Sequence, residues 1–485
     1  MEELPAGGRM KQAVVVIHGM GEQVPMDTLM GFSESVWATD SDLIDAARPD
    51  SSTGAKRTTN AIWFKPDEYS RSYELRRLAT ESLPGRGSTH FYEFYWAHLM
   101  EGTTFEHFRA WAKDLLWRSP RRVPQGLGLA WTVLWIITIV AATCFVLSLI
   151  PSEGKAWYWA VLGGITSLAI GGLVNTLLLK YFGDVARYVK ASPPNVARRQ
   201  EIREKGVQLL ESLMGIKPDG TATPPEYDRI VVVAHSLGTI VAYDILTHAF
   251  ARLNTRMTAA KDQPELVKME DLIRQATGLG HLARAPQQQG VDLDAFQAQQ
   301  ALCRAELNAQ GNPWIVSDFV TLGSPLAHAE FLLAYDKTAL RKAQEQRVLP
   351  TCPPTLEYDA TTEKRHMSYR TAAGADAPRM PHHAALFAFT RWTNIYSRHK
   401  AILWGDIISG PVGKQFDLAV NDRTFSGIRD IAVLPEPKDG KVGWKFWPPF
   451  FTHTKYWTLP RSWRVGAAVP HHIAELRKAL KLKQR

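Results

Sequence analysis

The sequence predicts an α/β protein with a mostly parallel sheet and helices on both of its faces. Two short runs of apolar residues carry this prediction, Ala13 to Ile17 and Ile230 to Val233. Continuous runs rich in β-branched residues are typical of strands buried on both faces of a parallel sheet. After the second run, apolar residues recur at helical spacing, which predicts a strand–turn–helix unit: Ile240, Val241, Ile245, Leu246 and Ala249.

The turn inside this unit reads Ala234-His235-Ser236-Leu237-Gly238. Small residues two before and two after the serine let strand and helix pass close together, so that the hydroxyl is held above the edge of the sheet. This is the pattern of a nucleophile elbow. Ala234 replaces the glycine that usually opens the motif, and a methyl group fits there at some cost in strain. An incidental serine between a buried strand and a helix is the alternative, which the flanking pattern disfavours.

The 485 residues could hold two or three ordinary domains or one domain enlarged by insertions. We expect one core, formed by residues 1–120 and 191–485, with an apolar segment at 121–190 between them. A polar, Gln-rich segment at 254–312 is expected to be partly helical and to act as a lid, with a disordered linker as the alternative. Residues 337–381 are expected to form an irregular surface insertion. The remaining expected strands are 61–64, 91–96, 315–322, 387–396 and 428–434, and the expected amphipathic helices are 27–47 and 196–213.

The apolar segment contains two uncharged runs, Gly126 to Ile150 with 25 residues and Ala156 to Leu179 with 24. Each exceeds the roughly 20 residues that cross a bilayer as a helix, and the short link predicts a transmembrane hairpin. Basic residues flank it, which favours cytoplasmic ends: Arg118, Arg121, Arg122, Lys180, Arg187 and Lys190. We therefore predict an integral protein of the bacterial inner membrane, with the catalytic domain and both termini on the cytoplasmic side. A buried core hairpin or a hydrophobic lid is the alternative.

Charge and cysteine content limit the binding partners and the cellular compartment that we expect. The net charge is +9, and its excess lies around the apolar segment, which favours anionic lipid. No nucleic-acid motif accompanies the charge, so we expect no nucleic-acid partner. The three cysteines show no disulfide or metal spacing, which fits a reducing compartment, and the N-terminus has no signal-peptide pattern. We expect no metal, because the one cluster of histidines lacks a further ligand at helix spacing: His366, His382 and His383.

The first predicted strand runs directly into His18-Gly19-Met20-Gly21. A strand that ends in His-Gly, with a serine elbow much later in the chain, resembles the α/β-hydrolase superfamily and in particular its lipases and phospholipases. The resemblance covers about half the chain and implies an α/β-hydrolase fold. It also implies that the backbone amides of Met20 and Leu237 form an oxyanion hole. His18 is expected to brace this loop and not to act as the base.

The resemblance extends to the loop that carries the triad acid. Trp392-Thr393-Asn394-Ile395-Tyr396 is similar to a strand that lipases carry shortly before this acid, and Asp406 is the first carboxylate after it. Asp417 and Asp422 are the alternatives. Ser324, in Gly323-Ser324-Pro325, is a second candidate nucleophile. It is disfavoured because Pro325 cannot open a packed helix as an elbow requires.

The superfamily places its catalytic histidine in the loop after the last core strand. Here that loop contains His453, followed three and four residues later by Tyr456 and Trp457, which is similar to the lipase version. His399 is the second choice, and His471 and His472 come too late, at the head of a C-terminal helix. The chain order Ser236, Asp406, His453 is the hydrolase order of nucleophile, acid and base.

The expected function is a membrane-anchored serine hydrolase that cleaves phospholipid or other glycerolipid esters without a cofactor. A thioesterase, protein deacylase or acyltransferase on the same triad is one alternative, because the leaving group is selected by the shape of the pocket. A non-catalytic membrane adaptor on a hydrolase scaffold is another. Glu93 and His98 could also be read as an acid and a base, but structural roles are favoured because neither lies in a recognisable catalytic context.

Overall fold

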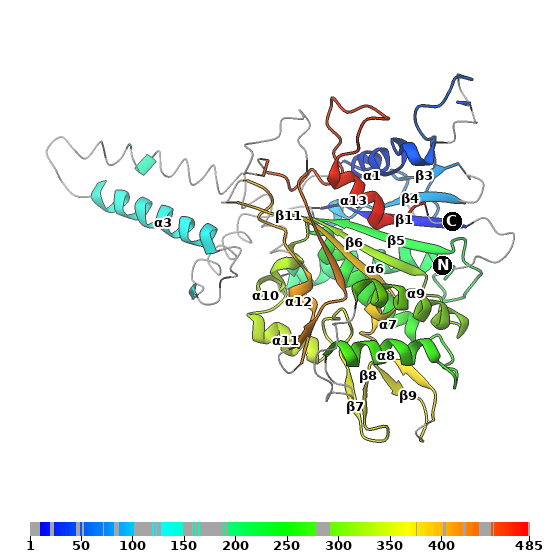
Figure 1. Ribbon diagram of the computed structural model, residues 1–485. Helices are drawn as coiled ribbons and strands as arrows, with labels where there is room; N and C mark the ends of the chain where they lie inside the picture. Colours follow the sequence, from blue (N-terminus) through cyan, green and yellow to red (C-terminus); the bar gives the residue numbers. More distant parts are fainter. Residues whose placement is uncertain are drawn as a thin grey trace.

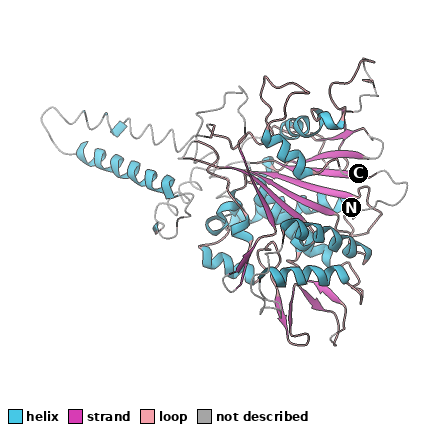
Figure 2. Ribbon diagram, viewed as in Figure 1, coloured by secondary structure: helices cyan, strands magenta, loops and turns pink. Residues whose placement is uncertain are grey.

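The computed structural model describes residues 10–19, 24–44, 49–50, 53–70, 72–81, 87–100, 119–120, 123, 128–148, 158, 161, 163–164, 188–189, 193–277, 292–374, 376–400, 404–420, 423–435, 448–449 and 451–483. Its centre is an eight-stranded sheet built from β1 (Lys11–Ile17), β2 (Ile62–Pro66), β3 (Arg76–Thr80), β4 (Ser88–Phe94), β5 (Arg229–His235), β6 (Val316–Leu322), β11 (Arg391–Ser397) and β14 (Ile428–Val433). Figure 2 shows these strands fanning through the middle of the molecule.

The strands follow the order β14-β11-β6-β5-β1-β4-β3-β2. Every pair from β14 to β4 is parallel, whereas β3 and β2 are antiparallel and form one edge. The α/β class and the mostly parallel sheet that the sequence predicts are therefore confirmed. Because the strands from β14 to β4 are parallel, the segments that follow them leave the sheet at the same edge. These include the segments after β1, β5, β6, β11 and β14.

Helices cover both faces of the sheet (Figure 1). On one face, α1 (Asp27–Ser33) and α13 (His471–Leu480) bury Phe32 and Leu476 against Val14 and Val16. On the other face, α7 (Gly238–Asn254) packs on β1, and α6 (Pro193–Leu213) and α9 (Leu293–Ala309) belong to the same buried cluster, which contains Val15. Successive side chains of a strand point to opposite faces, so an uninterrupted apolar run such as β1 serves both cores.

Most expected elements occur near their predicted bounds; one helix ends early, and one strand of the sheet was not predicted. The predicted helix at 27–47 ends early: α1 continues as a π-helical turn to Ala38, where the Asn60 side chain donates to the carbonyl oxygens of Trp37 and Asp40. Residues 45–48 lie outside the described part. The strand β3 was not predicted, because Arg-Arg-Leu-Ala-Thr alternates too weakly to stand out; it joins the sheet through Leu78, which pairs with Phe91.

The segment at 254–312 is partly helical, as expected, whereas the segment at 337–381 contains more regular structure than expected. The first holds α9 and α8 (Pro264–Thr277). The second holds α11 (Lys337–Glu345) and two small hairpins, β7 (Glu357–Asp359) with β8 (Lys364–His366) and β9 (Ser368–Arg370) with β10 (Arg379–Pro381). The remaining short elements are α10 (Ala329–Leu332), α12 (Gly413–Phe416), β12 (Leu418–Val420) and β13 (Arg423–Phe425).

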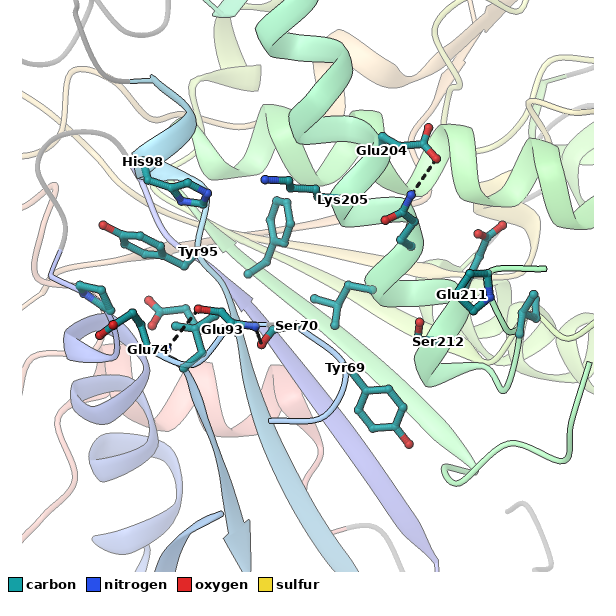
Figure 3. A pocket seen from close by; sticks show the side chains of 18 of the residues that line it. Tyr69, Ser70, Glu74, Glu93, Tyr95, His98, Glu204, Lys205, Glu211 and Ser212 are labelled. Atoms are coloured by element: carbon teal, nitrogen blue, oxygen red, sulfur yellow. Dashed lines mark hydrogen bonds between the residues drawn. The ribbon is translucent and has the colours of Figure 1, made fainter. Parts of the chain in front are cut away.

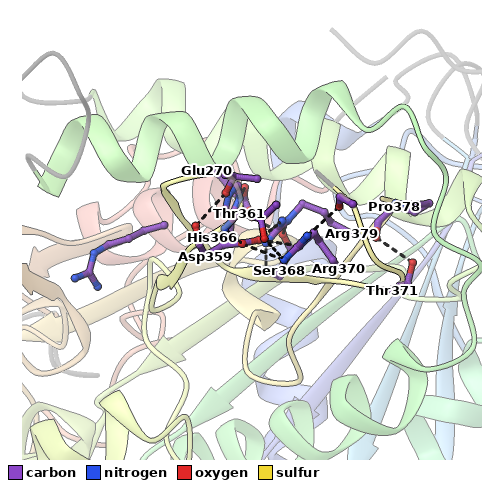
Figure 4. A network of polar contacts seen from close by, with 12 residues as sticks. Glu270, Asp359, Thr361, His366, Ser368, Arg370, Thr371, Pro378 and Arg379 are labelled. Atoms are coloured by element: carbon purple, nitrogen blue, oxygen red, sulfur yellow. Dashed lines mark hydrogen bonds and ion pairs between the residues drawn. The ribbon is translucent and has the colours of Figure 1, made fainter. Parts of the chain in front are cut away.

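A buried polar network ties α8 to these hairpins (Figure 4). The Glu270 carboxylate accepts hydrogen bonds from the Ser368 hydroxyl at 2.6 Å and the Met367 amide at 3.1 Å, and it pairs with His366. Arg379 extends the network by donating to Ser368. A buried charge is stable only when it is paired and hydrogen-bonded in this way. These contacts join the segment at 254–312 to the segment at 337–381.

The first uncharged run forms α3 (Gly128–Ser148), which Figure 1 shows projecting away from the sheet and its helices. Within the described ranges, none of the helices combines the length and the apolar character that a membrane crossing requires. The predicted second span, 156–179, lies almost entirely outside the described residues. The six flanking basic residues of the hairpin prediction also lie outside them.

Candidate active site

Ser236 occupies a sharp turn between β5 and α7. Its φ of 53° is in the left-handed region, which a residue with a side chain rarely adopts. Its amide donates to the carbonyl oxygen of Leu322 on the neighbouring β6 at 3.0 Å. The turn is also crowded: a Cβ atom at Gly238 would lie 2.3 Å from the carbonyl oxygen of His18, so glycine is required there. Strain of this kind persists only where the surrounding structure enforces it.

A directed chain of hydrogen bonds holds this turn. The Thr239 hydroxyl donates to the carbonyl oxygen of Ser236 at 2.7 Å, so it must accept from Ser324, whose Oγ lies 2.8 Å away. The Ser324 Oγ in turn accepts from the amide of Leu326 at 3.2 Å. Ser324, the second candidate nucleophile, is thus fully buried, and its hydroxyl is bonded to Thr239 and to the amide of Leu326. It braces the serine that forms the turn.

The side chains of Ser236, His453 and Asp406 come from separate loops and form one hydrogen-bonded series. Nε2 of His453 lies 2.7 Å from Ser236 Oγ, and Nδ1 of His453 lies 2.9 Å from Oδ2 of Asp406. A carboxylate can only accept, so in the neutral imidazole Nδ1 carries the proton and Nε2 accepts the serine hydroxyl. The three residues are 1–2% exposed. The structure therefore brings together the three side chains that the sequence analysis selected as nucleophile, base and acid.

Asp406 is held ionised by its surroundings. Burial by itself would raise the pKa of the carboxyl. The charge of His453 and hydrogen bonds from His453, Tyr456 and Ser409 outweigh burial and lower the pKa to about 2. The other carboxylate oxygen, Oδ1, accepts from the amide of Ile408 at 3.0 Å. A carboxylate that stays negative beside an imidazole stabilises the imidazolium that forms when the histidine takes a proton.

Gly323 leaves the space in which these groups meet. Its φ is +59°, and a Cβ atom there would lie 2.6 Å from Cε2 of Tyr456, 3.2 Å from Oδ2 of Asp406 and 3.3 Å from Cε1 of His453. Any side chain would therefore displace the tyrosine and press on the other two. The Gly-Ser-Pro sequence after β6 thus serves the site twice, through the missing side chain of Gly323 and the brace of Ser324.

Two further histidines brace the loops around the serine. Nε2 of His18 accepts from the Trp96 amide at 3.1 Å, and its Nδ1 lies 2.8 Å from the carbonyl oxygen of Gly19. Nε2 of His235 donates to the carbonyl oxygen of His453 at 2.7 Å. Burial is the main cause that lowers the pKa of His18 to about 4 and that of His235 to about 3, so both rings are neutral at pH 7.

The expected oxyanion hole is described only in part. Met20 lies outside the described residues. Leu237 is the residue before α7, where backbone N–H groups have no partner within the helix and the helix dipole favours negative charge. Gly19 packs tightly on Ser236, since a Cβ atom there would lie 2.9 Å from Cβ of Ser236. The loop after β1 therefore begins directly beside the serine.

The alternative residues are engaged elsewhere. Asp417 forms an ion pair with Arg341, and Asp422 lies outside the described residues. His472 contacts the carbonyl oxygen of Thr458 at 3.0 Å. For His399 and His471, no contact to Ser236 or Asp406 is recorded within the described ranges. No group of three or more metal-ligating side chains occurs in the described part of the chain.

Glu93 and His98 line a separate cavity of about 660 Å3 between the end of β4 and α6 (Figure 3). Glu93 accepts from the amide of Met26 at 2.6 Å, and burial raises its pKa to about 7. The His98 ring stacks on that of Tyr95 at 5.5 Å. The lining includes none of the three residues clustered at the elbow, which supports the structural reading of this pair. A second cavity, of about 640 Å3, lies at the hairpins of Figure 4.

Sequence reasoning missed two residues that organise the acid loop. Tyr456 donates to Oδ2 of Asp406 at 2.7 Å. Asn394 donates to the carbonyl oxygen of Gly410 at 2.9 Å and to Asp430 at 2.7 Å, which anchors the far end of the same loop. Asn394 lies in the strand motif that precedes Asp406, and Tyr456 lies in the motif that follows His453. Both motifs served only to locate the candidate acid and base. A polar residue in the middle of a buried strand was the available signal for Asn394.

Comparison of the chain with protein-family models, with curated proteins and with solved structures finds no significant match. The assignment of a role to this site therefore depends on the geometry and chemistry of its residues.

Proposed function

We propose that the protein is a serine hydrolase of the α/β-hydrolase superfamily that cleaves carboxylic esters of lipids through an acyl-enzyme. One observation carries the proposal: the continuous hydrogen-bonded series Ser236, His453, Asp406 at a left-handed turn between a strand and a helix. Nucleophile, base and orienting acid within hydrogen-bond reach are the signature of an activated serine. The parallel sheet with this turn after a central strand supports the superfamily assignment.

In the proposed mechanism, Ser236 Oγ attacks the acyl carbonyl carbon while Nε2 of His453 accepts the hydroxyl proton. The amides of Leu237 and Met20 stabilise the oxygen that becomes negative. His453 then gives the proton to the leaving alcohol as its C–O bond breaks. Water next attacks the acyl-enzyme, its proton goes to His453 and then to Ser236, and the fatty acid leaves. Apart from the substrate and the attacking water, side chains and backbone amides of this chain supply the groups that this scheme uses.

The substrate class and the location rest on the apolar segment. Ile136, Ile139 and Val146 of α3 are 54%, 55% and 56% exposed on a helix that stands away from the core (Figure 1). Exposed contiguous apolar surface of this kind suits a lipid environment. We propose that the segment 121–190 holds the protein in the cytoplasmic membrane, where phospholipid or glycerolipid esters are the substrates at hand. Extraction of membranes with alkaline carbonate tests this; release of the protein into the supernatant would contradict the anchor.

A fluorophosphonate probe tests the nucleophile directly, because it phosphonylates only an activated serine. Membranes with the wild-type protein, Ser236→Ala and Ser324→Ala are compared. Labelling should disappear in Ser236→Ala and persist in Ser324→Ala, whose reactive serine is intact. Labelling that survives Ser236→Ala would refute the proposed nucleophile. An unlabelled wild-type protein would favour the adaptor alternative.

Substrate assays then separate the hydrolase from its close alternatives. Purified protein is offered a phospholipid, a monoacylglycerol and an acyl thioester, with Ser236→Ala as the matched control. Release of fatty acid from the lipid esters, dependent on Ser236, is the expected result. Turnover of the thioester alone would move the assignment to a thioesterase or protein deacylase.

A further inference from the structure

The hydroxyl of Tyr456 lies at the junction between the acid loop and the core. The ring is 1% exposed. Its oxygen is 2.9 Å from the amide nitrogen of Ser397, 2.7 Å from Oδ2 of Asp406 and 3.0 Å from Oγ of Ser409. A buried phenol needs only one or two partners, so this arrangement exceeds what burial requires.

The direction of these bonds follows from the partners. The Ser397 amide can only donate, so the phenol accepts there. Burial, above all, raises the pKa of Tyr456 well above its usual value, so the phenol keeps its proton. Asp406 is ionised and can only accept. The single proton of Tyr456 is therefore directed at Oδ2 of Asp406, the same oxygen that accepts from Nδ1 of His453.

Besides Ser409, the donors that fix the orientation of the carboxylate are two side chains and one backbone amide. Tyr456 and His453 share Oδ2, and the Ile408 amide occupies Oδ1. With Tyr456 in place, Oδ2 has one remaining direction in which to accept from the imidazole. Gly323 makes the approach possible, because its missing side chain is the space into which the tyrosine ring fits.

We propose that Tyr456 is a positioning residue of the proposed triad. By donating to Oδ2 of Asp406, it holds the carboxylate in the orientation that directs Nε2 of His453 at Ser236. The inference rests on the proposed function. The competing explanation is that Tyr456 only fills the core and satisfies its own hydroxyl, in which case the loss of that hydroxyl would lower stability without changing the chemistry.

Tyr243 provides a matched control. It is equally buried, on α7, and its hydroxyl donates to the carbonyl oxygen of Pro350 at 2.7 Å and not to Asp406. Tyr243→Phe and Tyr456→Phe each remove one phenolic oxygen and keep the ring. Stability loss is common to both variants, whereas an effect on chemistry is specific to Tyr456 if the inference is right.

The experiment measures the rate of fluorophosphonate labelling of the purified full-length protein at increasing probe concentration, together with the melting temperature. Tyr456→Phe should lower the maximal labelling rate about tenfold, the effect of losing one hydrogen bond to a charged group, and leave the half-saturating probe concentration unchanged. Tyr243→Phe should keep both labelling parameters and lower the melting temperature. A maximal rate within about twofold of wild type in folded Tyr456→Phe, or a change confined to half-saturation, would overturn the inference.

A second variant keeps the test decisive if Tyr456→Phe does not fold. Ser409→Ala keeps the ring and removes the Ser409 hydroxyl, which contacts both the phenol and Asp406, so it should lower the maximal rate about threefold. An unchanged rate in that variant would overturn the inference. Failure of the wild-type protein to label is a different result: it would contradict the proposed function and the positioning role with it.

Discussion

Nε2 of His453 lies 2.7 Å from Oγ of Ser236, although 217 positions separate the two residues in the chain. The sheet produces this contact. Ser236 follows the central strand β5, and His453 belongs to the segment after the edge strand β14. Both strands point the same way, so the segments that follow them emerge at one edge of the sheet. The carbonyl oxygen of His453 accepts a hydrogen bond from the ring of His235, which keeps His453 beside Ser236.

Asp406→Asn should abolish most of the reactivity of Ser236 without unfolding the protein. An asparagine amide can turn its NH2 group to Nδ1 of His453, which places the imidazole proton on Nε2, where it blocks transfer from the serine. We expect the maximal labelling rate to fall about 10⁴-fold, by analogy with other serine triads. Asp417→Asn, which alters an ion pair with Arg341 outside the elbow, is the control. Equal losses in the two variants would show that Asp406 is not the triad acid.

Gly323→Ala should impair both stability and labelling. The added methyl group would lie 2.6 Å from the Tyr456 ring, and the backbone has a φ of +59°. Gly54→Ala separates backbone strain from crowding, because the φ of Gly54 is +67° and nothing lies within 4 Å of the added methyl group. Gly54→Ala should cost about 1 kcal/mol from backbone strain alone. Gly323→Ala should cost several times more in urea denaturation and lose labelling; similar costs would contradict the crowding.

Glu93→Gln should change how stability depends on pH. Burial raises the pKa of Glu93 from 4.5 to about 7, so the folded state binds the proton more tightly than the unfolded chain does. Stability from this group is therefore complete below about pH 4.5 and is lost as the pH rises to 7. Relative to Glu93→Gln, wild type should lose roughly 2–3 kcal/mol across this window.

Urea denaturation of wild type and Glu93→Gln at several pH values between 4.5 and 8 measures this difference. Glu74→Gln is the control, since Glu74 lines the same cavity but is exposed. Parallel pH profiles for wild type and Glu93→Gln would contradict a raised pKa in the folded state.

Asp318→Asn should destabilise the fold strongly. Its buried carboxylate accepts from Arg391 at 2.9 Å and from Arg229 at 2.8 Å, and Arg229 also donates to the last carbonyl oxygen of α13. Removing the negative charge between two buried guanidinium groups should cost about 3–5 kcal/mol. Asp294→Asn, in an exposed pair with Arg429, should cost under about 1 kcal/mol. Comparable losses of unfolding free energy in the two variants would contradict a stabilising role for the Asp318 ion pairs.

Much of the fold was predictable because its signals are local. An uninterrupted run such as Val231 to Val233 can only be satisfied by burial on both faces, which requires a central parallel strand and covering helices. The candidate nucleophile was predictable for the same reason, since the elbow is encoded within five consecutive residues. The early end of α1 was not, because it depends on the side chain of Asn60, which is distant in the sequence. The edge strand β3 depends in the same way on its partner β4.

The sequence by itself determined the class of the fold, the identity of the elbow serine and the order of the three candidate side chains along the chain. Tertiary structure decided between the candidates: it places His453 beside that serine and Asp406 beside His453. It also gave Tyr456, Gly323 and Ser324 their roles around the site. The physical reason is the separation along the chain over which each interaction acts. Propensity, hydrophobic period and turn chemistry act over a few residues, whereas a hydrogen bond between loops depends on where parallel strands deliver their ends.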